Sequence, residues 1–284
     1  MTATIIKGLP VANVIREELA AKAKELAAKG IEPKLAVILA GGDEASRVYA
    51  QAKGKVGEKV GVKVEVHVRP DDVKEEDLLA LVDQLNADPK VHGILVELPL
   101  PKHVRKELVM NRLDPKKDVD GVHPVNRGYL LGGQEHLALV PATPLSCIEL
   151  IQRSGVELKG KRVALVGRGD TVGRPLASLL IKRDATITVC HTKTVDIGSI
   201  TKAAEIVVAA AGSPGLVRAD MLSPGQIVID AGINQVGDGI VGDVGEGAAE
   251  VVAFLTPVPG GVGSLTTSII MSNLLKAIGL QGLA

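Results

Sequence analysis

The sequence predicts an α/β protein composed of two α/β domains. Segments whose apolar residues recur at helical spacing alternate with short apolar runs that are typical of buried strands. This alternation fills the first half of the chain, and a second series of the same kind begins near residue 141. A length of 284 residues and a hydrophobic content of 46% are sufficient for two domains that each bury a core. Regular alternation of helix and strand favours parallel sheets joined by helical crossovers.

The first domain is expected to span residues 1–140. Its helical segments show apolar residues on one face, and its strand segments are bounded by glycine or proline. Helices are predicted over residues 10–29, 44–60 and 74–87, and strands over 35–39, 62–68 and 91–98.

The second domain is expected to span residues 141–267, with a helix over 173–182. Its strands are predicted over residues 162–166, 185–190, 206–210 and 227–229. The last helix begins near residue 266, and we expect the segment 268–284 to pack back on the first domain. Two such domains predict a cleft between them, where the carboxyl ends of parallel strands commonly form binding sites.

Composition excludes several classes of partner. Basic and acidic residues number 33 each, so there is no electrostatic argument for nucleic acid or an anionic membrane. A single Phe, two Tyr and no Trp provide no platform for base stacking, and no apolar run is long enough to span a membrane. Cys147 and Cys190 lie in separate segments without a C-x-x-C motif, which favours a reducing, cytoplasmic setting. No His, Cys and Asp cluster has metal-ligand spacing, so no metal is expected.

A glycine-rich loop follows the predicted strand 162–166 and precedes the predicted helix. Gly167, Gly169 and Gly173 form a G-x-G-x-x-x-G pattern, one residue longer than the usual dinucleotide fingerprint. Glycines let the backbone approach a pyrophosphate closely, and a helix amino terminus offers free N–H groups. The alternative is a strand-to-helix turn that needs glycine only for its backbone angles. Because strand, loop, helix and next strand occur in order, we predict a Rossmann-like dinucleotide-binding domain.

The end of the next strand indicates which dinucleotide is bound. A site selective for NAD often carries Asp or Glu there, whereas this strand is followed by His191, Thr192 and Lys193. Arg168, Thr192 and Lys193 are therefore available to surround a 2′-phosphate, which favours NADP over NAD. The alternative for Lys193 is an ordinary solvated lysine.

The first domain carries a candidate reaction centre. Tyr49 and Lys53 are four residues apart and share one face of the predicted helix. Glu97 is the one acid in an apolar strand, where a carboxylate costs free energy unless it is paired, and Lys53 is the natural partner. The alternatives are a surface pair on an exposed helix and a Glu97 that reaches water at the strand end.

Two further segments carry candidate residues. In the predicted turn over 116–124, either Asp118 or Asp120 is able to cap the turn, and Asp120 is also able to present its carboxylate to a nitrogen-rich ligand. The Gly-rich and Pro-rich segment 256–264 is either a connector or a stiff loop that brings backbone to a ligand.

Taken in chain order, these motifs resemble the methylenetetrahydrofolate dehydrogenase/methenyltetrahydrofolate cyclohydrolase family. Each motif is weak alone, but together they are specific and cover nearly the whole chain. They are Y-x-x-x-K at Tyr49 and Lys53, GILVELPLP at 93–101, KDVDGVHPVN at 117–126, PATP at 141–144, VIDAGIN at 228–234 and TPVPGGVG at 256–263.

The resemblance implies a homodimer that oxidises 5,10-methylenetetrahydrofolate with NADP. In this family the methenyl product is commonly hydrolysed to 10-formyltetrahydrofolate, so tetrahydrofolate derivatives are the implied substrates. The resemblance also implies that Lys53 is the central acid/base or electrostatic residue, that Tyr49 stacks on or orients the folate, and that Asp120 anchors the pterin.

The resemblance assigns the remaining binding positions as well. Catalytic positions are Lys53, Tyr49, Glu97 and Asp120. The folate is implied to contact Tyr49, Lys53, Leu98, Pro99, Asp120, Pro259, Gly260 and Gly261. The cofactor is implied to contact Gly167, Arg168, Gly169, Thr171, Val172, Gly173, His191, Thr192 and Ile233.

The sequence departs from the family pattern at several positions. Glu97 replaces a usual Gln, Ala142 a usual Cys, Gly169 a usual Ser, and Ser264-Leu265 a usual Pro-Met. Glu97 bears most directly on mechanism, because hydrolysis needs a group that accepts a proton from water and a carboxylate favours the charged form of a neighbouring lysine. We hypothesise that Glu97 weakens the cyclohydrolase relative to the dehydrogenase, or that it takes over part of the base role.

Two other functions remain open from sequence. One is a two-domain nicotinamide dehydrogenase whose first domain serves a different substrate. The other is a non-catalytic nucleotide-binding or folate-binding protein that has lost activity through Glu97 and the altered loops.

Overall fold

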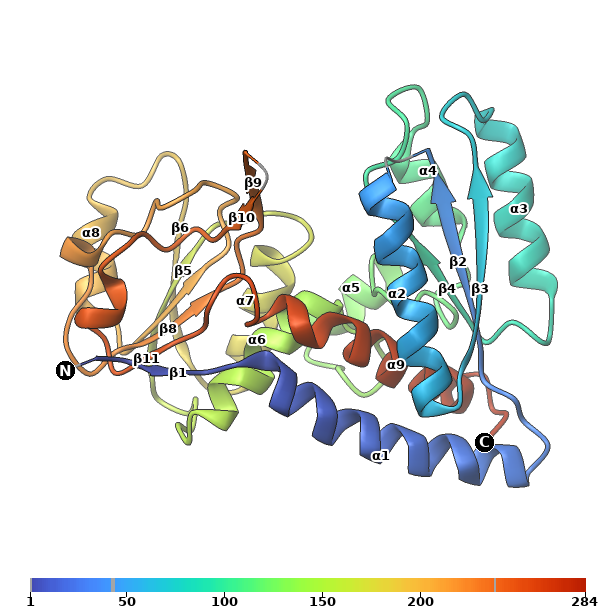
Figure 1. Ribbon diagram of the computed structural model, residues 1–284, viewed down its shortest axis with the longest axis horizontal. Helices are drawn as coiled ribbons and strands as arrows, with labels where there is room; N and C mark the ends of the chain where they lie inside the picture. Colours follow the sequence, from blue (N-terminus) through green and yellow to red (C-terminus); the bar gives the residue numbers. More distant parts are fainter. Residues whose placement is uncertain (1, 42–43, 238) are drawn as a thin grey trace. The chain divides into compact units, whose positions relative to one another are not determined.

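The structure is a computed structural model that describes residues 2–41, 44–237 and 239–284, with the side chains of 44–49 outside the described part. The chain forms two compact units (Figure 1). The first, which we call the glycine-loop unit, contains the chain up to residue 13 and residues 141–266. The second, the Lys53 unit, contains residues 14–140 and 267–284.

The Lys53 unit is built on a parallel sheet with the strand order β3-β2-β4. Figure 1 shows α2 and α3 lying beside these strands. The buried core combines apolar residues of the strands, such as Ile38 and Ile94, with apolar residues of α3, such as Leu78 and Val82. The strands are β2 (Lys34–Ala40), β3 (Lys63–Arg69) and β4 (Gly93–Val96), and the helices are α2 (Glu44–Val60), α3 (Glu75–Ala87), α4 (Lys106–Arg112) and α5 (Pro124–Leu131). The helix α1 (Gly8–Ala28) belongs to this unit from residue 14 onward.

A short segment continues this sheet beyond β4. The Ile94 N–H donates to the carbonyl of Lys117 at 2.6 Å, and the Val119 N–H donates to the carbonyl of Ile94 at 3.4 Å. The segment 117–119 thus runs parallel to β4, with Asp118 opposite Ile94. The sequence predicted this segment to be part of a turn. That prediction is confirmed by the turns at Lys117 and Val119, and the isolated bridge of Asp118 to Ile94 is a feature that the sequence did not reveal.

The last helix, α9 (Gly263–Leu280), supplies polar contacts inside the Lys53 unit. The buried amide of Asn273 donates to the carbonyls of Val119 at 2.8 Å and Val140 at 2.7 Å. Lys276 Nζ donates to the carbonyls of Glu135 and Ala138 at 2.8 and 2.7 Å. These bonds fasten the helix to backbone groups that lie more than a hundred residues earlier in the sequence.

The glycine-loop unit contains a six-stranded parallel sheet with the order β1-β11-β8-β7-β5-β6, which confirms the predicted α/β class. A two-stranded antiparallel hairpin, β9 and β10, follows β8. The strands are β1 (Thr4–Ile5), β5 (Arg162–Val166), β6 (Thr186–Cys190), β7 (Ile206–Ala209), β8 (Ile227–Asp230), β9 (Asn234–Val236), β10 (Gly239–Val241) and β11 (Phe254–Leu255). The helices are α6 (Ala142–Arg153), α7 (Gly173–Lys182) and α8 (Ile197–Ala203), with 3-10 turns at Ala219–Met221 and Ala248–Glu250.

The start of the chain belongs to the glycine-loop unit, whereas the sequence analysis placed residues 1–140 together. Thr4 and Ile5 pair in parallel with Phe254 and Leu255, so β1 forms the outer strand of the six-stranded sheet. Ala3 is buried in the core of the same unit. A two-residue strand has no periodicity that a sequence reveals, so only the partner strand identifies it.

A pair of glycines tests how tightly the Lys53 unit is packed. A Cβ atom on Gly93 would lie 2.4 Å from Val119 Cγ1 and 2.6 Å from Leu274 Cδ1, both of them buried. We expect Gly93→Ala to lower the free energy of unfolding by about 1–3 kcal/mol, the usual cost of overpacking a core. The measurement is the midpoint of urea unfolding, followed by circular dichroism.

The matched control is Gly279→Ala in α9, where an added Cβ meets nothing within 4 Å. Replacing glycine by alanine inside a helix raises stability by up to about 1 kcal/mol. The two substitutions add the same methyl group, so equal effects on the midpoint would contradict the described packing around Gly93.

Candidate functional site

A buried ion pair lies at the carboxyl end of β4. Lys53 Nζ, on α2, lies 2.7 Å from Glu97 Oε1, and the Lys53 side chain is only 3% exposed. Glu97 follows the last residue of β4, and its N–H donates to the carbonyl of Ile38 at 2.9 Å. The predicted pairing of these two residues is confirmed, and the alternative of an exposed surface pair is wrong for Lys53. The Glu97 side chain keeps 19% of its surface exposed, so the carboxylate is also open to water in part.

Tyr49 lies one helical turn before Lys53 on α2, but its side chain is outside the described residues. Leu98 and Pro99 follow Glu97 directly and are exposed at the same strand end.

Asp120 lies at the same edge of the sheet as Glu97. It follows the segment 117–119, which runs parallel to β4, so the two acids come after neighbouring strand-like segments. Its side chain is half-buried. Gly121 comes next with a φ of 62°, a backbone conformation that residues with a side chain rarely adopt. The Lys53 unit by itself therefore gathers an ammonium and two carboxylates at one sheet edge.

Asp118 has a structural place in the loop that follows. Its carboxylate is buried and accepts hydrogen bonds from the His123 N–H at 2.8 Å and from Asn126 Nδ2 at 2.9 Å. Burial raises the pKa of Asp118 above its usual value, and these hydrogen bonds oppose the shift. Asp118, one of the two acids that sequence left open as turn caps, holds this turn.

The whole segment 256–264 lies in the glycine-loop unit. Pro259 and Gly260 are exposed, and the Gly260 carbonyl accepts the Gly8 N–H at 2.8 Å. A Cβ atom on Gly261 would lie 2.4 Å from the Pro257 carbonyl oxygen, so this loop folds tightly on itself.

The glycine loop after β5 is shaped by two of its three glycines. Gly167 has a φ of 121°, and a Cβ there would lie 2.0 Å from the carbonyl oxygen of Ala210. A Cβ on Gly173 would lie 2.4 Å from the carbonyl oxygen of Gly167, whereas one on Gly169 meets nothing within 4 Å. Backbone packing thus requires Gly167 and Gly173. The outer surface of the loop, at Arg168, Gly169 and Thr171, is exposed, and Val172 precedes the first residue of α7.

The candidate 2′-phosphate residues lie after two neighbouring strands. Val166 of β5 is in register with Cys190 of β6, so Arg168 and the segment His191–Lys193 follow adjacent strand ends. Arg168, Thr192 and Lys193 are all exposed. Three hydrogen bonds shape this turn. The His191 N–H donates to Thr194 Oγ1 at 2.9 Å, the Lys193 N–H donates to His191 Nδ1 at 3.1 Å, and the Thr194 N–H donates to the carbonyl of His191 at 2.8 Å.

Two buried carboxylates that the sequence analysis missed hold the loops after β7 and β8. Asp243 accepts hydrogen bonds from the consecutive N–H groups of residues 211, 212 and 213 at 2.6, 2.9 and 2.8 Å. Asp230 accepts the N–H groups of Gly232, Asp243 and Val244 at 2.9 to 3.0 Å, and burial raises the pKa of Asp230. Ile233 lies just beyond, with 64% of its surface exposed. The one sequence signal was an acid at the end of an apolar run, in VIDAGIN.

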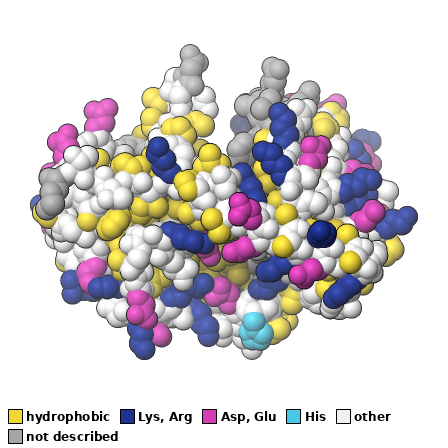
Figure 2. All heavy atoms as spheres, turned by 60° about the horizontal axis from the view of Figure 1, so that its bottom comes forward, with side chains coloured by type: hydrophobic (Ala, Val, Ile, Leu, Met, Phe, Trp, Pro, Cys, Tyr) yellow, Lys and Arg dark blue, Asp and Glu magenta, His cyan; other side chains and the backbone are white. Residues whose placement is uncertain are grey.

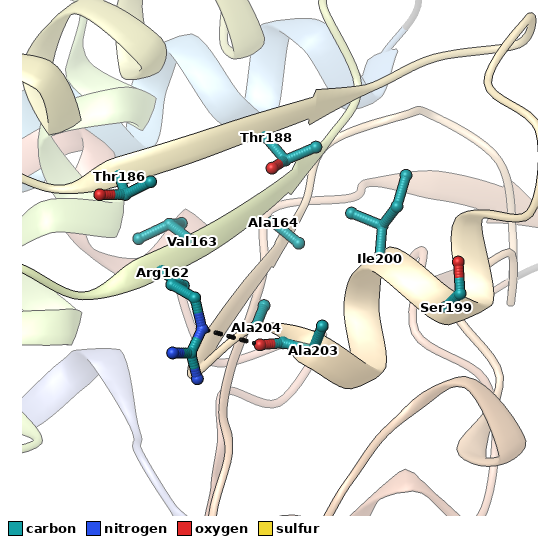
Figure 3. A pocket seen from close by; sticks show the side chains of 9 residues that line it. All are labelled: Arg162, Val163, Ala164, Thr186, Thr188, Ser199, Ile200, Ala203 and Ala204. Carbon is teal, nitrogen blue, oxygen red and sulfur yellow. Dashed lines mark hydrogen bonds between the residues drawn. The ribbon is translucent and has the colours of Figure 1, made fainter.

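A hollow of about 300 Å³ lies elsewhere in the glycine-loop unit (Figure 3). Arg162 and Thr186 are the first residues of β5 and β6, whereas the glycine loop follows the last residue of β5, so the hollow is separate from that loop. Arg162 Nε donates to the carbonyl of Ala203 at 3.0 Å across one side of it. Its lining consists of Arg162, Val163, Ala164, Thr186, Thr188, Ser199, Ile200, Ala203 and Ala204.

In the described part of the chain, no group of three His, Cys, Asp or Glu side chains is placed to hold a metal ion. Among the helices of these same residues, none is both long and apolar enough to cross a bilayer. Basic and acidic side chains are interspersed on the face drawn in Figure 2.

Comparison with known proteins places both units in one family. Residues 6–120 match the family model of the tetrahydrofolate dehydrogenase/cyclohydrolase catalytic domain. Residues 141–281 match the model of the NAD(P)-binding domain of the same family. Two curated relatives are similar over almost their whole length. Bifunctional protein FolD 2 of Desulfitobacterium hafniense (strain Y51) is 54% identical over 98% of both chains, and bifunctional protein FolD of Heliobacterium modesticaldum is 55% identical over 99% of this chain and 98% of its own.

Solved structures agree with this assignment. The bifunctional FolD enzyme of Campylobacter jejuni superimposes with a TM-score of 0.94 at 41% identity, over 98% of this chain and 99% of its own. The FolD enzyme of Trypanosoma brucei, solved with NADP and an inhibitor, gives a TM-score of 0.94 at 39% identity over the full length of both chains. The chain described here belongs to the tetrahydrofolate dehydrogenase/cyclohydrolase family.

Proposed function

We propose that this chain is an NADP-dependent methylenetetrahydrofolate dehydrogenase that also acts as a methenyltetrahydrofolate cyclohydrolase. It oxidises 5,10-methylenetetrahydrofolate to the 5,10-methenyl form and hydrolyses that product to 10-formyltetrahydrofolate. The observation that carries the proposal is the buried pair of Lys53 and Glu97 at a sheet edge, in a chain that both domains of the family match.

The glycine-loop unit has the features that a nicotinamide dinucleotide needs. Gly167 and Gly173 let the backbone turn tightly, and the exposed loop ends at the amino terminus of α7, where N–H groups favour a pyrophosphate. Arg168 and Thr192 suit a 2′-phosphate, and no acid follows β6 directly to repel it. Bound NADP supplies the acceptor for the hydride. Gly169, Thr171, Val172, His191 and Ile233 complete the proposed set.

The Lys53 unit holds the groups proposed to act on the folate. Asp120 offers its carboxylate to the N–H groups of the pterin, and Tyr49 stacks on or orients the folate. Leu98 and Pro99 line the folate site beside Glu97, and the family resemblance also assigns Pro259, Gly260 and Gly261 to folate binding. The oxidation is mainly a matter of positioning, because the substrate nitrogens stabilise the cation that forms.

Hydrolysis makes a different demand on the Lys53–Glu97 pair. The attacking water must lose a proton, and an ammonium group cannot accept one. Glu97 lies 2.7 Å from Lys53 Nζ and forms an ion pair with it. The pair therefore favours the dehydrogenase over the cyclohydrolase, unless Glu97 itself takes the proton from water.

We further propose that the enzyme is a cytoplasmic homodimer. The family resemblance supports the dimer, and two free, buried cysteines, Cys147 and Cys190, are in keeping with a reducing compartment. Light scattering of the purified protein measures its molar mass and so tests the dimer directly.

The activity is tested by turnover of 5,10-methylenetetrahydrofolate with NADP and then with NAD. We expect NADPH to form, with kcat/KM for NADP at least about tenfold above that for NAD, because Arg168 and Thr192 bind the 2′-phosphate. Absorbance follows both the reduced cofactor and the methenyl product. A panel of hydroxy acids is the control, because it tests whether the chain is a dehydrogenase for a different substrate. No NADPH from the folate would overturn the proposal, and equal use of NAD would overturn the 2′-phosphate assignment.

The role of Glu97 is tested by Glu97→Gln, which keeps the size of the side chain and removes its charge. We expect the ratio of cyclohydrolase to dehydrogenase rate to rise at least about fivefold, since proton transfer by a positioned group contributes about a hundredfold or more to a rate. Both rates are measured on the same preparation.

A fall in the ratio of cyclohydrolase to dehydrogenase rate would identify Glu97 itself as the base, and an unchanged ratio would exclude both roles.

The companion variant is Lys53→Met, which we expect to reduce hydrolysis more than hydride transfer. Equal losses in the two reactions would count against a specific acid/base role for Lys53.

The glycine loop offers a matched pair of substitutions. Gly169→Ser adds a side chain where a Cβ meets nothing within 4 Å, and its hydroxyl is an added donor for a phosphate. We expect it to keep or tighten NADP binding. Gly173→Ser forces a Cβ against the Gly167 carbonyl, so we expect binding to weaken more than about tenfold. Fluorescence titration with NADPH measures both, and a weaker Gly169→Ser variant would contradict the described open space.

A further inference from the structure

Buried polar side chains hold the backbone on both sides of Asp120, and the proposed function assigns them no role. The central one is Asp118, whose carboxylate is 1% exposed. A single oxygen, Oδ2, accepts the His123 N–H at 2.8 Å and the Asn126 amide at 2.9 Å. Its other oxygen, Oδ1, has no hydrogen-bond partner among the described residues. Asp118 thus closes the loop 118–126 from inside the protein.

Asn126 extends this closure to two other segments. Its Nδ2 also donates to the carbonyl of Pro115 at 2.9 Å, and its Oδ1 accepts the Leu139 N–H at 3.1 Å. The amide is buried. The Asn126 side chain therefore connects three parts of the chain, which are Pro115, Asp118 and the segment that contains Leu139.

Asn273, on α9, holds the residue that separates the two aspartates. Its Nδ2 donates to the carbonyl of Val119 at 2.8 Å, while the Val119 N–H bonds to the carbonyl of Ile94. After Asp120, the Gly121 N–H donates to the carbonyl of Asp118 at 3.0 Å. The peptide groups on each side of Asp120 are consequently fixed, and the Asp120 side chain is the part of the segment that stays half-buried at the sheet edge.

We propose that Asp118 is a positioning residue of the folate site, which acts by fixing the loop that presents the Asp120 carboxylate to the pterin. The inference rests on the proposed function. Its physical reason is that a displacement of about 1 Å in a binding group costs about a hundredfold in rate. Two buried hydrogen bonds to one oxygen restrict the loop far more than a solvated aspartate would.

The geometry requires an acceptor at Asp118 more than it requires a charge. Both donors reach the same oxygen, and the amide oxygen of asparagine occupies the same place. Alanine removes the acceptor and leaves the His123 N–H and the Asn126 amide without it. The comparison of Asp118→Asn with Asp118→Ala therefore separates loss of positioning from loss of charge.

The experiment measures kcat and KM for methylenetetrahydrofolate and the dissociation constant for NADPH. For Asp118→Ala we expect kcat/KM for the folate to fall about thirtyfold or more, with NADPH binding changed less than twofold. Asp118→Asn should recover most of that loss. An Asp118→Asn variant as impaired as Asp118→Ala would overturn the proposed role of the acceptor.

The matched control is Lys117→Met, one residue away. Lys117 Nζ donates to the carbonyls of Asn86 and Asp88 at 2.7 and 2.8 Å, at the end of α3. Losing these bonds should lower the unfolding midpoint and leave KM for the folate unchanged. If Asp118→Ala behaves in the same way, Asp118 is only a structural residue and the inference fails.

A double-mutant cycle gives the sharpest test. If Asp118 acts through Asp120, the double variant Asp118→Ala with Asp120→Ala should be no more than about twofold worse than Asp120→Ala alone. Losses that multiply would overturn the inference. Direct titration with tetrahydrofolate is a second readout that needs no turnover. If wild-type protein binds tetrahydrofolate but shows no turnover, the proposed function is refuted and the inference is not. The affinity of the Asp118 variants for tetrahydrofolate would then still decide the inference.

Discussion

Charges that are removed from water must be bound by other groups, and this constraint determines both candidate sites of the molecule. Lys53 is nearly inaccessible and has a carboxylate of Glu97 at 2.7 Å. Asp118 and Asp243 are buried and accept hydrogen bonds from backbone N–H groups and amide side chains. An unpaired buried charge costs several kcal/mol, so each such group selects the one arrangement of its neighbours that binds it. The loops that carry the exposed site residues inherit their shape from these buried contacts.

Parallel sheets determine where such groups come together. In the Lys53 unit, Glu97 follows β4 and Asp120 follows the segment paired with β4, so their positions at one edge are a consequence of strand direction. The glycine-loop unit uses the same geometry for the loops after β5, β7 and β8. Side chains far apart in sequence meet at one edge because every strand of such a sheet ends there. The helix α2 then needs only to place Lys53 above the edge.

Features that depend on residues close together in the sequence were predicted better than features that depend on residues far apart. Helices α2 and α7 were predicted with the bounds that the structure shows, because their apolar residues recur with the helical period. The pairing of Lys53 with Glu97 was predicted since a single acid in an apolar strand needs a partner. The strand β1, two residues long, was not predicted, because its only signal is its partner β11. The contacts of Asp243 were missed for the same reason, since its donors are backbone groups about thirty residues away.

In the proposed function, the contact between Glu97 and Lys53 affects the two reactions in opposite ways. Hydride transfer leaves a cation on the folate, and a negative charge at the same sheet edge stabilises that cation. Hydrolysis needs a group that accepts a proton from water, and the amine that the family resemblance assigns to this role is in contact with the Glu97 carboxylate. A neutral amide at this position would remove the ion pair and, with it, the negative charge that is proposed to favour oxidation. We therefore propose that the balance between the two activities depends on Glu97, the residue that directly follows β4.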